Sequence, residues 1–252
     1  MKDYKRLWAI LGLIMIGSFF ILGYFGKEVY NEKPPVPTAF VDENGQTLYT
    51  KDDIMAGQSA WQSIGGMSVG TVWGHGAYQA PDWTADWIHR EVLGWLDQQA
   101  QREYGKNYAE LSPRDQATLN YDAQQAFRKN TYDPATDKVT LSADRVRSIE
   151  AVAAYYDKLF GADPELHKLR EAYAMKEDTL PSAEKRAKLN AFFFWSAWAA
   201  STNRPNLDVT YTNNWPHEPL IGNQPSAENV IWSITSVVTL IFGIGSVIWI
   251  WA

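Results

Sequence analysis

The sequence predicts a mainly α-helical protein with an N-terminal transmembrane helix, an outer helical domain that includes a small β-hairpin, and a second transmembrane helix. Two long apolar runs without charged residues, at positions 7–26 and 230–252, predict the transmembrane helices, because about 20 helical residues cross the hydrocarbon of a bilayer. Capping residues before periodic apolar segments predict the helices between them. An Asn-Gly pair between two short extended runs predicts the hairpin.

The first apolar run, Leu7–Gly26, follows the basic residues Lys2, Lys5 and Arg6. A cleaved signal peptide would share this basic start, but the run is longer than a signal core and no small-x-small cleavage site follows it. The segment is therefore expected to be an uncleaved membrane anchor. The positive-inside rule places residues 1–6 in the cytoplasm.

The second run, Val230–Ala252, has Trp232 near one boundary and Trp249 and Trp251 near the other, where indole rings favour the membrane interface. Residues 27–229 are then expected outside the cytoplasm, in the periplasm or the exterior, with the protein in the inner or plasma membrane. Basic residues should follow a span that returns to the cytoplasm, and none follows this one. A fragment of a larger polytopic protein is therefore favoured, and a natural terminus at Ala252 is the alternative.

The composition excludes several classes of function for the outer region. A formal net charge of −6 argues against nucleic acid as a partner, which calls for a basic patch. The absence of cysteine means that packing, and not disulfides, must stabilise the domain. It also excludes a haem attached through CxxCH, an iron–sulfur cluster and a cysteine-bound copper site.

The outer region is expected to begin with a stiff proline-rich exit at Lys33–Pro37, followed by a hairpin at Ala39–Thr50 that turns at Asn44-Gly45. A glycine-rich segment, Ile64–Gly76, separates the first outer helix from the others. Helices are expected at residues 51–62, 82–105, 113–128, 143–160, from 163 onwards and 182–202, with an extended piece at 138–141 and an irregular segment at 203–226.

Particular residues predict the ends of these helices. Asp82 and Ser142 are typical N-caps, Pro113 suits a first helical position, and Gly161 is a typical stop. The last helix contains AFFFWSAWAAST, Ala191–Thr202, which is too short to span a bilayer. It is expected to be buried in the core or to lie against the membrane. The twelve tryptophans fit core packing or interface anchoring, and alone they do not indicate a quinone site.

Candidate catalytic chemistry is sparse in this region. The histidines His75, His89, His167 and His217 are too scattered for a short metal-binding spacing, and no nucleophile–base set indicates a hydrolase. His89 and His167 are interpreted as solvated residues, and the other two as hydrogen-bonded loop residues. The alternating charges of Arg145–Asp157 are interpreted as a solvated helix face.

Two aromatic-rich stretches carry a resemblance to a known family. They are GQSAWQSIGGMSVGTVWGHGAYQAPDWTADWIHRE at Gly57–Glu91 and FFFWSAWAASTNRPNLDVTYTNNWPHEPLIGNQPS at Phe192–Ser226. With the two predicted spans, they make essentially the whole chain resemble the N-terminal portion of quinol-dependent nitric oxide reductases, single-chain members of the haem-copper oxidase superfamily. The resemblance implies a haem-free, cytochrome-c-like helical domain followed by the first transmembrane helix of a catalytic core.

The resemblance also implies that a haem attachment site has been lost. The related cytochrome c subunit follows its CxxCH motif with GxGAYxAP, and Gly74–Pro81 reads GHGAYQAP here. By that alignment, Gly66, Val69 and Gly70 stand in the places of the two cysteines and the haem-ligating histidine. The resemblance therefore implies no haem c, and a core that receives electrons from quinol in the bilayer.

A calcium site is a further implication of the resemblance. In the related subunit, the glycine carbonyl and the tyrosine of the GAY segment help to hold a calcium ion that bridges towards haem propionates of the catalytic subunit. The Gly76 carbonyl and the Tyr78 side chain are therefore candidate calcium ligands, and the other ligands would come from beyond Ala252. A structural turn packed by Tyr78 is the alternative.

The resemblance implies that this segment is non-catalytic and caps the core of an enzyme that reduces nitric oxide to nitrous oxide with quinol electrons. Haem b, haem b3 and non-haem iron are expected on helices after the second span. The expected partners are this multi-helix core, membrane lipid and quinol, and the sequence leaves open whether the protein forms a homodimer. The alternatives are a two-span membrane sensor with an outer ligand-binding domain and, less favoured, a stand-alone outer hydrolase.

Overall fold

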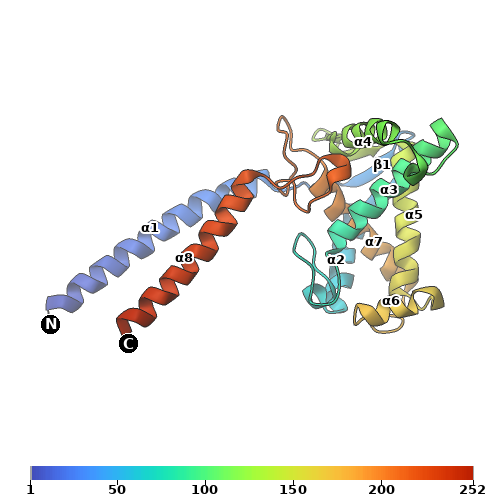
Figure 1. Ribbon diagram of the computed structural model, residues 1–252. Coiled ribbons are helices and arrows are strands. Elements are labelled where there is room, and N and C mark those ends of the chain that lie inside the picture. The colour runs from blue at the N-terminus through green and yellow to red at the C-terminus, as the bar shows by residue number, and fades with distance from the viewer. Residues whose placement is uncertain (1, 252) are drawn as a thin grey trace. The chain divides into compact units, whose positions relative to one another are not determined.

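The computed structural model describes residues 2–251, and the chain divides after Pro35 into two compact units. Helix α1 (Lys2–Glu32) makes up nearly all of the first unit (Figure 1). Within its stretch from Tyr4 to Glu32, an 18-residue window has a mean hydropathy of 2.1, and none of that window is buried. The helix therefore has the length and the composition of a membrane span, in agreement with the first predicted transmembrane helix.

The second unit ends in another long apolar helix, α8 (Ala227–Trp251). An 18-residue window within it has a mean hydropathy of 2.0, and none of that window is buried. Both helices extend into polar sequence beyond the uncharged runs, so α1 continues to Glu32 and α8 begins before Glu228. The predicted limits of the membrane segments, at 7–26 and 230–252, stay predictions.

The outer helices begin where the capping residues predict. Asp82, Ser112, Ser142 and Ser182 each accept a backbone N–H of the first helical turn with the side chain. The helices are α2 (Lys51–Ser63), α3 (Trp83–Tyr104), α4 (Pro113–Arg128), α5 (Ala143–Phe160), α6 (His167–Ala172) and α7 (Ala183–Ser201), with the single turns η1 (Gly66–Val69), η2 (Tyr108–Glu110), η3 (Pro164–Leu166) and η4 (Pro219–Ile221).

The two glycines at the helix ends differ in conformation. Gly105 follows α3 with φ 62°, the left-handed conformation that glycine adopts readily. Gly161 follows α5 with φ −91°, so it ends the helix in an extended conformation. The prediction that α5 ends at Gly161 is confirmed.

The predicted hairpin is confirmed as part of a larger sheet. Strands β1 (Ala39–Asp42) and β2 (Thr47–Thr50) are antiparallel and turn through Gly45 at φ 80°. The expected extended piece is β4 (Lys138–Leu141), which pairs in parallel with β1, and β3 (Tyr132–Asp133) adds an edge. Within the described residues the strand order is β2-β1-β4-β3. The sheet thus joins the start of the outer domain to its middle.

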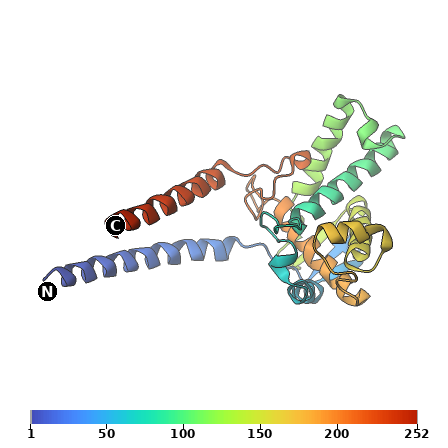
Figure 2. The ribbon, with the colours of Figure 1, turned by 60° about the horizontal axis from the view of Figure 1, so that its bottom comes forward.

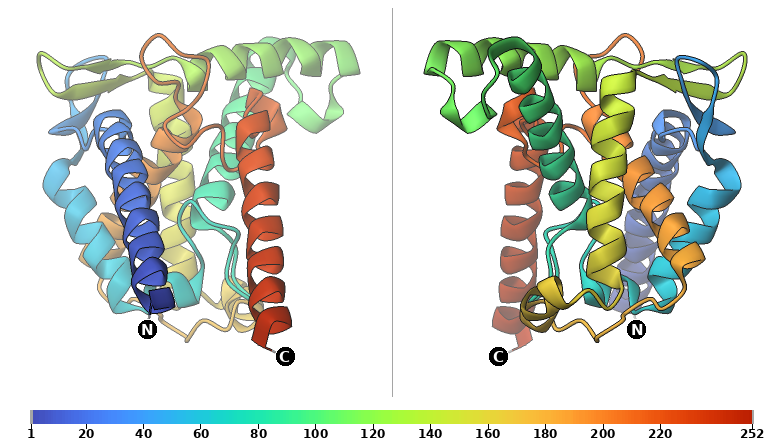
Figure 3. Two further views of the ribbon diagram at one scale, coloured as in Figure 1. Left: turned by 90° about the vertical axis from the view of Figure 1, so that its left-hand side faces the viewer. Right: turned by 90° about the vertical axis from the view of Figure 1, so that its right-hand side faces the viewer.

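Helix α7 forms the centre of the outer domain. The right-hand view of Figure 3 shows it, in orange, between α2 and α5, and α3 also packs against it. Gly57 allows α2 to approach closely, because a Cβ atom there would overlap the Lys188 carbonyl oxygen and lie 2.8 Å from Cβ of Phe192. The segment 191–202 is therefore part of the domain core, as one of the two expected alternatives proposed.

Aromatic rings fill the space around α7. The Trp83 ring stacks on Phe193 with centroids 5.8 Å apart, and Trp87 stacks on Tyr156 at 5.1 Å. On the other side of α7, Phe40 of β1 meets Phe194 edge to face at 4.9 Å. Each such pair adds about 1 kcal/mol to the free energy gained from burying its area. Several of the tryptophans thus serve the core and not the membrane interface.

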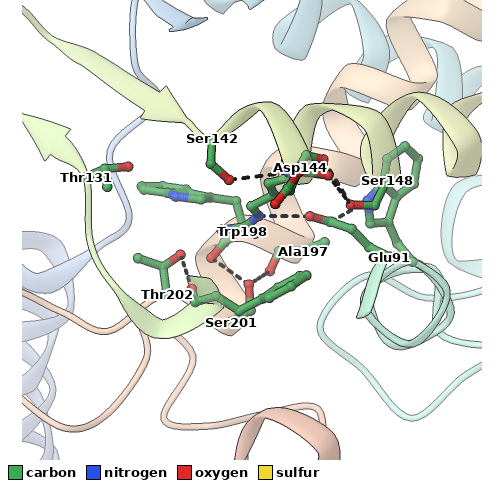
Figure 4. Close-up of polar contacts among 12 residues, drawn as sticks. Glu91, Thr131, Ser142, Asp144, Ser148, Ala197, Trp198, Ser201 and Thr202 are labelled. Atoms are coloured by element: carbon green, nitrogen blue, oxygen red, sulfur yellow. Dashed lines mark hydrogen bonds and ion pairs between the residues drawn. The ribbon is translucent and has the colours of Figure 1, made fainter. Parts of the chain in front are cut away.

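One ion pair lies inside this aromatic core. The Arg145 Nε donates to the Glu91 carboxylate at 2.8 Å, and the Trp87 indole N–H donates to its other oxygen at 3.0 Å. Figure 4 shows Glu91 facing the first turns of α5, near Ser142 and Ser148. Burial raises the pKa of Glu91, against the opposing effect of the Arg145 guanidinium. The interpretation of Arg145 as part of a solvated face is therefore wrong.

Helices α3 and α4 run side by side at one end of the domain (Figure 2). The Tyr108 hydroxyl in the turn between them donates to the Asn120 side chain at 2.7 Å. The C-terminal end of α4 lies against η4 and the irregular segment that leads into α8. This arrangement brings the end of α4 close to the start of the second apolar helix.

Candidate functional site

The glycine-rich loop, defined here as residues 64–82, is organised by the buried carboxylate of Asp82. One Asp82 oxygen caps α3 by accepting the Ala85 backbone N–H at 3.0 Å. The other oxygen accepts the Thr71 hydroxyl and the Gly74 N–H, both at 2.7 Å. A single carboxylate therefore fixes both the start of α3 and the path of the loop.

A tryptophan holds this loop against the core in a strained conformation. Trp73 has φ 55°, a left-handed conformation that is costly for a residue with a side chain. Its indole N–H donates to the Ser196 carbonyl of α7 at 2.9 Å, and its ring lies 5.2 Å from that of Trp195. Its backbone N–H is bonded to the Thr84 hydroxyl at 3.3 Å. Trp73 thus attaches the glycine-rich loop to α7 and to the first turn of α3.

A second loop, the lead-in loop of residues 203–226, is joined to the glycine-rich loop. The Trp215 indole N–H donates to the Gly74 carbonyl at 2.8 Å. The His75 ring meets the Trp215 ring edge to face, with centroids 4.6 Å apart. The glycine-rich loop and the lead-in loop therefore form one connected unit.

The positions that the resemblance aligns with a haem attachment site lie at the base of the glycine-rich loop. Gly66 and Val69 belong to the η1 turn, and Gly70 follows it with φ 92°. The Trp83 indole N–H donates to the Val69 carbonyl at 2.6 Å. A Cβ atom on Gly70 would overlap that indole and lie 2.7 Å from the Pro81 carbonyl oxygen. The structure thus leaves no room for a side chain at Gly70, the position that the resemblance aligns with a haem-ligating histidine.

The two candidate calcium ligands lie at the tip of the same loop. Gly76 has φ 87°, and its N–H donates to the Thr71 hydroxyl at 2.8 Å, whereas its carbonyl accepts no hydrogen bond from the described residues. The side chain of Tyr78 is fully exposed. The alternative in which Tyr78 packs a structural turn is therefore not what the structure has. Both groups are free to meet a partner.

The donor set suits part of a calcium site. A backbone carbonyl and a phenol oxygen are hard ligands, but calcium takes about six to eight oxygens. No cluster of three or more histidine, cysteine or acidic side chains that could hold a metal occurs within residues 2–251. Gly76 and Tyr78 would therefore act as two ligands of a site that a partner surface completes.

Comparison with known families identifies the domain. A model of the cytochrome c-like domain of NorB, a nitric oxide reductase component, matches residues 37–217. The chain belongs to this family. Comparison with individual curated proteins gives no match.

Membership of the NorB nitric oxide reductase family agrees with the fold described above. The matched range begins just before β1 and ends inside the lead-in loop, so it includes the glycine-rich loop and the whole aromatic core. The family is related to redox enzymes of membranes, and two helices of this chain have the length and composition of membrane spans. Residues 37–217 thus form a cytochrome c-like domain, and the sequence contains no cysteine.

His89 and His167 are exposed, as the sequence predicted. His89 Nδ1 is 2.9 Å from the buried carboxylate of Glu218 in the lead-in loop, so it links α3 to that loop. His75 and His217 lie in loops as expected, and neither side chain has a hydrogen bond to another described residue, so their interpretation as hydrogen-bonded residues stays a prediction. His167 is exposed as expected, and its hydrogen bond with Glu177 raises its pKa.

Sequence reasoning missed Arg128 at the end of α4. Its guanidinium donates to the carbonyls of Gly222 at 3.4 Å and Asp208 at 2.7 Å, and to the side-chain oxygens of Asn223 at 3.2 Å and Asn214 at 3.0 Å. These four bonds tie the lead-in loop to α4. The only signal in the sequence was a basic residue in the last helical turn, which usually stays solvated.

Proposed function

We propose that this chain is the N-terminal, non-catalytic part of a quinol-dependent nitric oxide reductase. Two nitric oxide molecules would take up two electrons and two protons to give nitrous oxide and water, and one quinol would supply both as it becomes quinone. Membership of the NorB nitric oxide reductase family supports the reaction class. The domain would cap the outer face of the catalytic core.

The observation that carries the quinol assignment is the base of the glycine-rich loop. Without cysteine the domain has no thiol for covalent haem attachment, and Gly70 lies against the Trp83 indole where the haem-ligating histidine would stand. A domain without this haem has no redox group to receive an electron from a soluble cytochrome. Quinol in the bilayer would therefore reduce the core directly.

The tip of the same loop would contact the core through a calcium ion. The Gly76 carbonyl and the Tyr78 hydroxyl would each give one oxygen, and residues of the core would give the rest. The calcium ion would hold negatively charged groups of the core close to this loop. The buried Asp82 and the Trp73 and Trp215 indoles would keep the two oxygens in position.

The proposed membrane arrangement follows from the two apolar helices. Helices α1 and α8 would cross the inner or plasma membrane, with the N-terminus in the cytoplasm. The cytochrome c-like domain between them would lie in the periplasm or outside the cell. This arrangement places the glycine-rich and lead-in loops on the same side as the outer ends of the core helices.

The test is nitric oxide consumption by the full-length enzyme, purified from its own membranes, with either a quinol or a reduced soluble cytochrome c as electron donor. We expect turnover with quinol and none above background with the cytochrome. Calcium content is measured in parallel on the wild type and on Tyr78→Phe, which removes one oxygen from the proposed site. We expect this change to lower bound calcium and activity about tenfold.

Tyr121→Phe is the matched control, because Tyr121 is another exposed tyrosine, on α4 and outside both loops. It should leave calcium content and activity at the wild-type level. Equal turnover with cytochrome c would contradict the quinol assignment. Unchanged calcium and activity in Tyr78→Phe would contradict the proposed calcium site, while an enzyme without nitric oxide reduction would overturn the proposal as a whole.

A further inference from the structure

A polar cavity lies between the end of α4 and the lead-in loop. Its volume is about 560 Å³, and its lining includes Arg128 and Lys129 from α4 and Asp208 from the loop. Gln224, on the opposite side of the lining, precedes the first residue of α8 by only a few positions. The cavity is therefore close to the start of the second apolar helix.

The positive charge at this cavity has no anionic partner in direct contact. Arg128 is nine-tenths buried, and its four hydrogen bonds go to neutral carbonyl and amide oxygens. None of the ion pairs among the described residues includes Arg128, Lys129 or Asp208. Burial lowers the pKa of Arg128, and the negative charge of Asp208 opposes this effect without a direct contact. A buried cation without a counter-ion is costly, so an anion at this place would stabilise the folded protein.

Two properties of the chain itself reduce this cost in part. The C-terminal end of α4 carries a partial negative charge of about half an elementary charge, which favours Arg128 and Lys129. Asp208 lines the same cavity, and its negative charge acts on Arg128. The formal charges of the three side chains still sum to one positive charge, in a chain whose net charge is −6. The cavity is thus a local positive region on an acidic protein.

Hydrogen-bond donors that the protein does not use line the same cavity. The ammonium of Lys129 and the side-chain amides of Gln124, Gln125 and Gln224 have no hydrogen-bond partner in the part of the chain that the structure describes. They come from two segments, since Gln124 and Gln125 belong to the end of α4, Lys129 follows it, and Gln224 belongs to the lead-in loop. Donors from two lining segments match an anion that accepts hydrogen bonds in several directions, as phosphate does.

We propose that this cavity binds a phosphate group, with Lys129 as the direct cationic contact and the buried Arg128 as the source of positive potential. The phosphate would be that of an anionic lipid headgroup or of free inorganic phosphate. The place of the cavity beside the start of α8 is compatible with a headgroup, because a membrane interface lies at the end of a spanning helix. This site is independent of the proposed reaction and of the calcium ligands.

The experiment uses the full-length protein in an uncharged detergent. Inorganic phosphate is titrated by calorimetry, and retention of phosphatidic acid against phosphatidylcholine is measured by native mass spectrometry. Lys129→Gln should weaken binding about fivefold, because it removes one partly exposed charge pair. Asp208→Asn should tighten binding about threefold, because it removes the negative charge that competes for the same cations. These opposite signs are expected of an anion site.

Lys106→Gln is the matched control, since Lys106 is exposed beyond the end of α3 and its replacement changes the net charge equally. It should leave binding unchanged. Binding of inorganic phosphate identifies free phosphate as a sufficient ligand, and selective retention of phosphatidic acid alone identifies a lipid headgroup. If neither ligand binds, if Lys106→Gln matches Lys129→Gln, or if Asp208→Asn does not tighten binding, the proposal is wrong.

Discussion

The helices around α7 and the two loops beside α3 and α8 are held by different kinds of contact. In the helical part, rings such as Trp83 and Phe193 stack in a dry core, and the single ion pair there is enclosed by them. In the loops, carboxylates, indole N–H groups and amides bind backbone groups, as Asp82 and Trp215 do. The first region depends on shape and volume, and the second on particular hydrogen-bond acceptors and donors.

This difference separates stability from function. A core of packed rings fixes the fold but presents nothing to a partner, because its side chains are buried. A loop held by hydrogen bonds can keep a strained backbone, such as that of Trp73, and still expose Tyr78 completely. Substitutions in the two regions should therefore have different effects, and three of them test the comparison.

The largest effect is expected where the core has no spare volume. Gly57→Ala places a methyl group onto the Lys188 carbonyl oxygen, so α2 and α7 must move apart. We expect the outer domain to lose about 4 kcal/mol or more of its unfolding free energy, a loss large enough to unfold a marginal domain. Thermal unfolding followed by tryptophan fluorescence measures it.

Gly94→Ala provides the matched control for this substitution. Gly94 is also helical, but the nearest atom to an added Cβ is Cβ of Ser148 at an ordinary 3.9 Å. Replacing this glycine should raise stability by about 0.5–1 kcal/mol through helix propensity. If both alanine variants were equally stable, close packing between α2 and α7 would not be what holds the core.

An intermediate effect is expected where the loop depends on one carboxylate. Asp82→Asn can keep the cap of α3 with its amide oxygen, but its NH₂ group cannot accept from Thr71 and Gly74. We expect a loss of about 2 kcal/mol and faster hydrogen exchange at the amides of Gly74 and Gly76, with the α5 and α7 amides still protected. Exchange followed by mass spectrometry resolves these segments.

Ser142→Ala is the control for the cap alone, because Ser142 accepts only the Arg145 N–H at the start of α5. It should cost about 1 kcal/mol and leave exchange in the glycine-rich loop unchanged. A loop that stays protected in Asp82→Asn would show that the tryptophan contacts alone hold it.

The smallest effect is expected at Asp53, which joins α2 to α7 at the edge of the core. Burial is the largest single influence on the pKa of Asp53 and raises it, but hydrogen bonds from Lys188 and Thr50 together outweigh burial and lower this pKa. Because the folded-state pKa is lowered, this stabilisation is present at neutral pH and is lost as the pH falls below about 4. Asp53→Asn should cost about 1 kcal/mol at pH 7.

The pH dependence separates the contribution of the Asp53 charge from that of its hydrogen bonds with Thr50, the N-cap of α2. The difference between the wild type and Asp53→Asn should shrink as the wild-type carboxylate takes up its proton, and urea unfolding at a series of pH values measures it. Asp52→Asn changes an exposed neighbouring position. Its unfolding free energy should fall at acid pH as that of the wild type does. A constant difference between the wild type and Asp53→Asn from pH 7 to pH 3 would rule out the ionic contribution.

Local sequence signals predicted most of the helices, because caps and turns act over a few residues. Asp82, Ser142 and the Asn44-Gly45 turn have the predicted roles. Contacts between distant segments were not predictable in this way. The parallel pairing of β1 with β4 and the burial of Arg145 beside Glu91 both join residues far apart in the sequence.

The candidate calcium ligands rest on the resemblance and stay a prediction, and the contacts that hold their loop were not predictable. The resemblance pointed to Gly76 and Tyr78, and the structure leaves both oxygens without an internal partner. The groups that hold the loop, above all Trp215 and the Arg128 contacts to the lead-in loop, gave no local signal. Hydrogen bonds from a side chain to a distant backbone carry no sequence period.

The central place of α7 also sets an order for folding during synthesis. Helices α2, α3 and α5 bury their apolar faces against a helix that the ribosome makes after all of them. Strand β1 must likewise wait for β4 before it gains its second neighbour. The outer domain therefore stays open until residues near Ser201 are available, when α8 is the next helix to emerge. Chaperone binding to the nascent chain should thus persist over almost the whole domain and end abruptly with the arrival of α7.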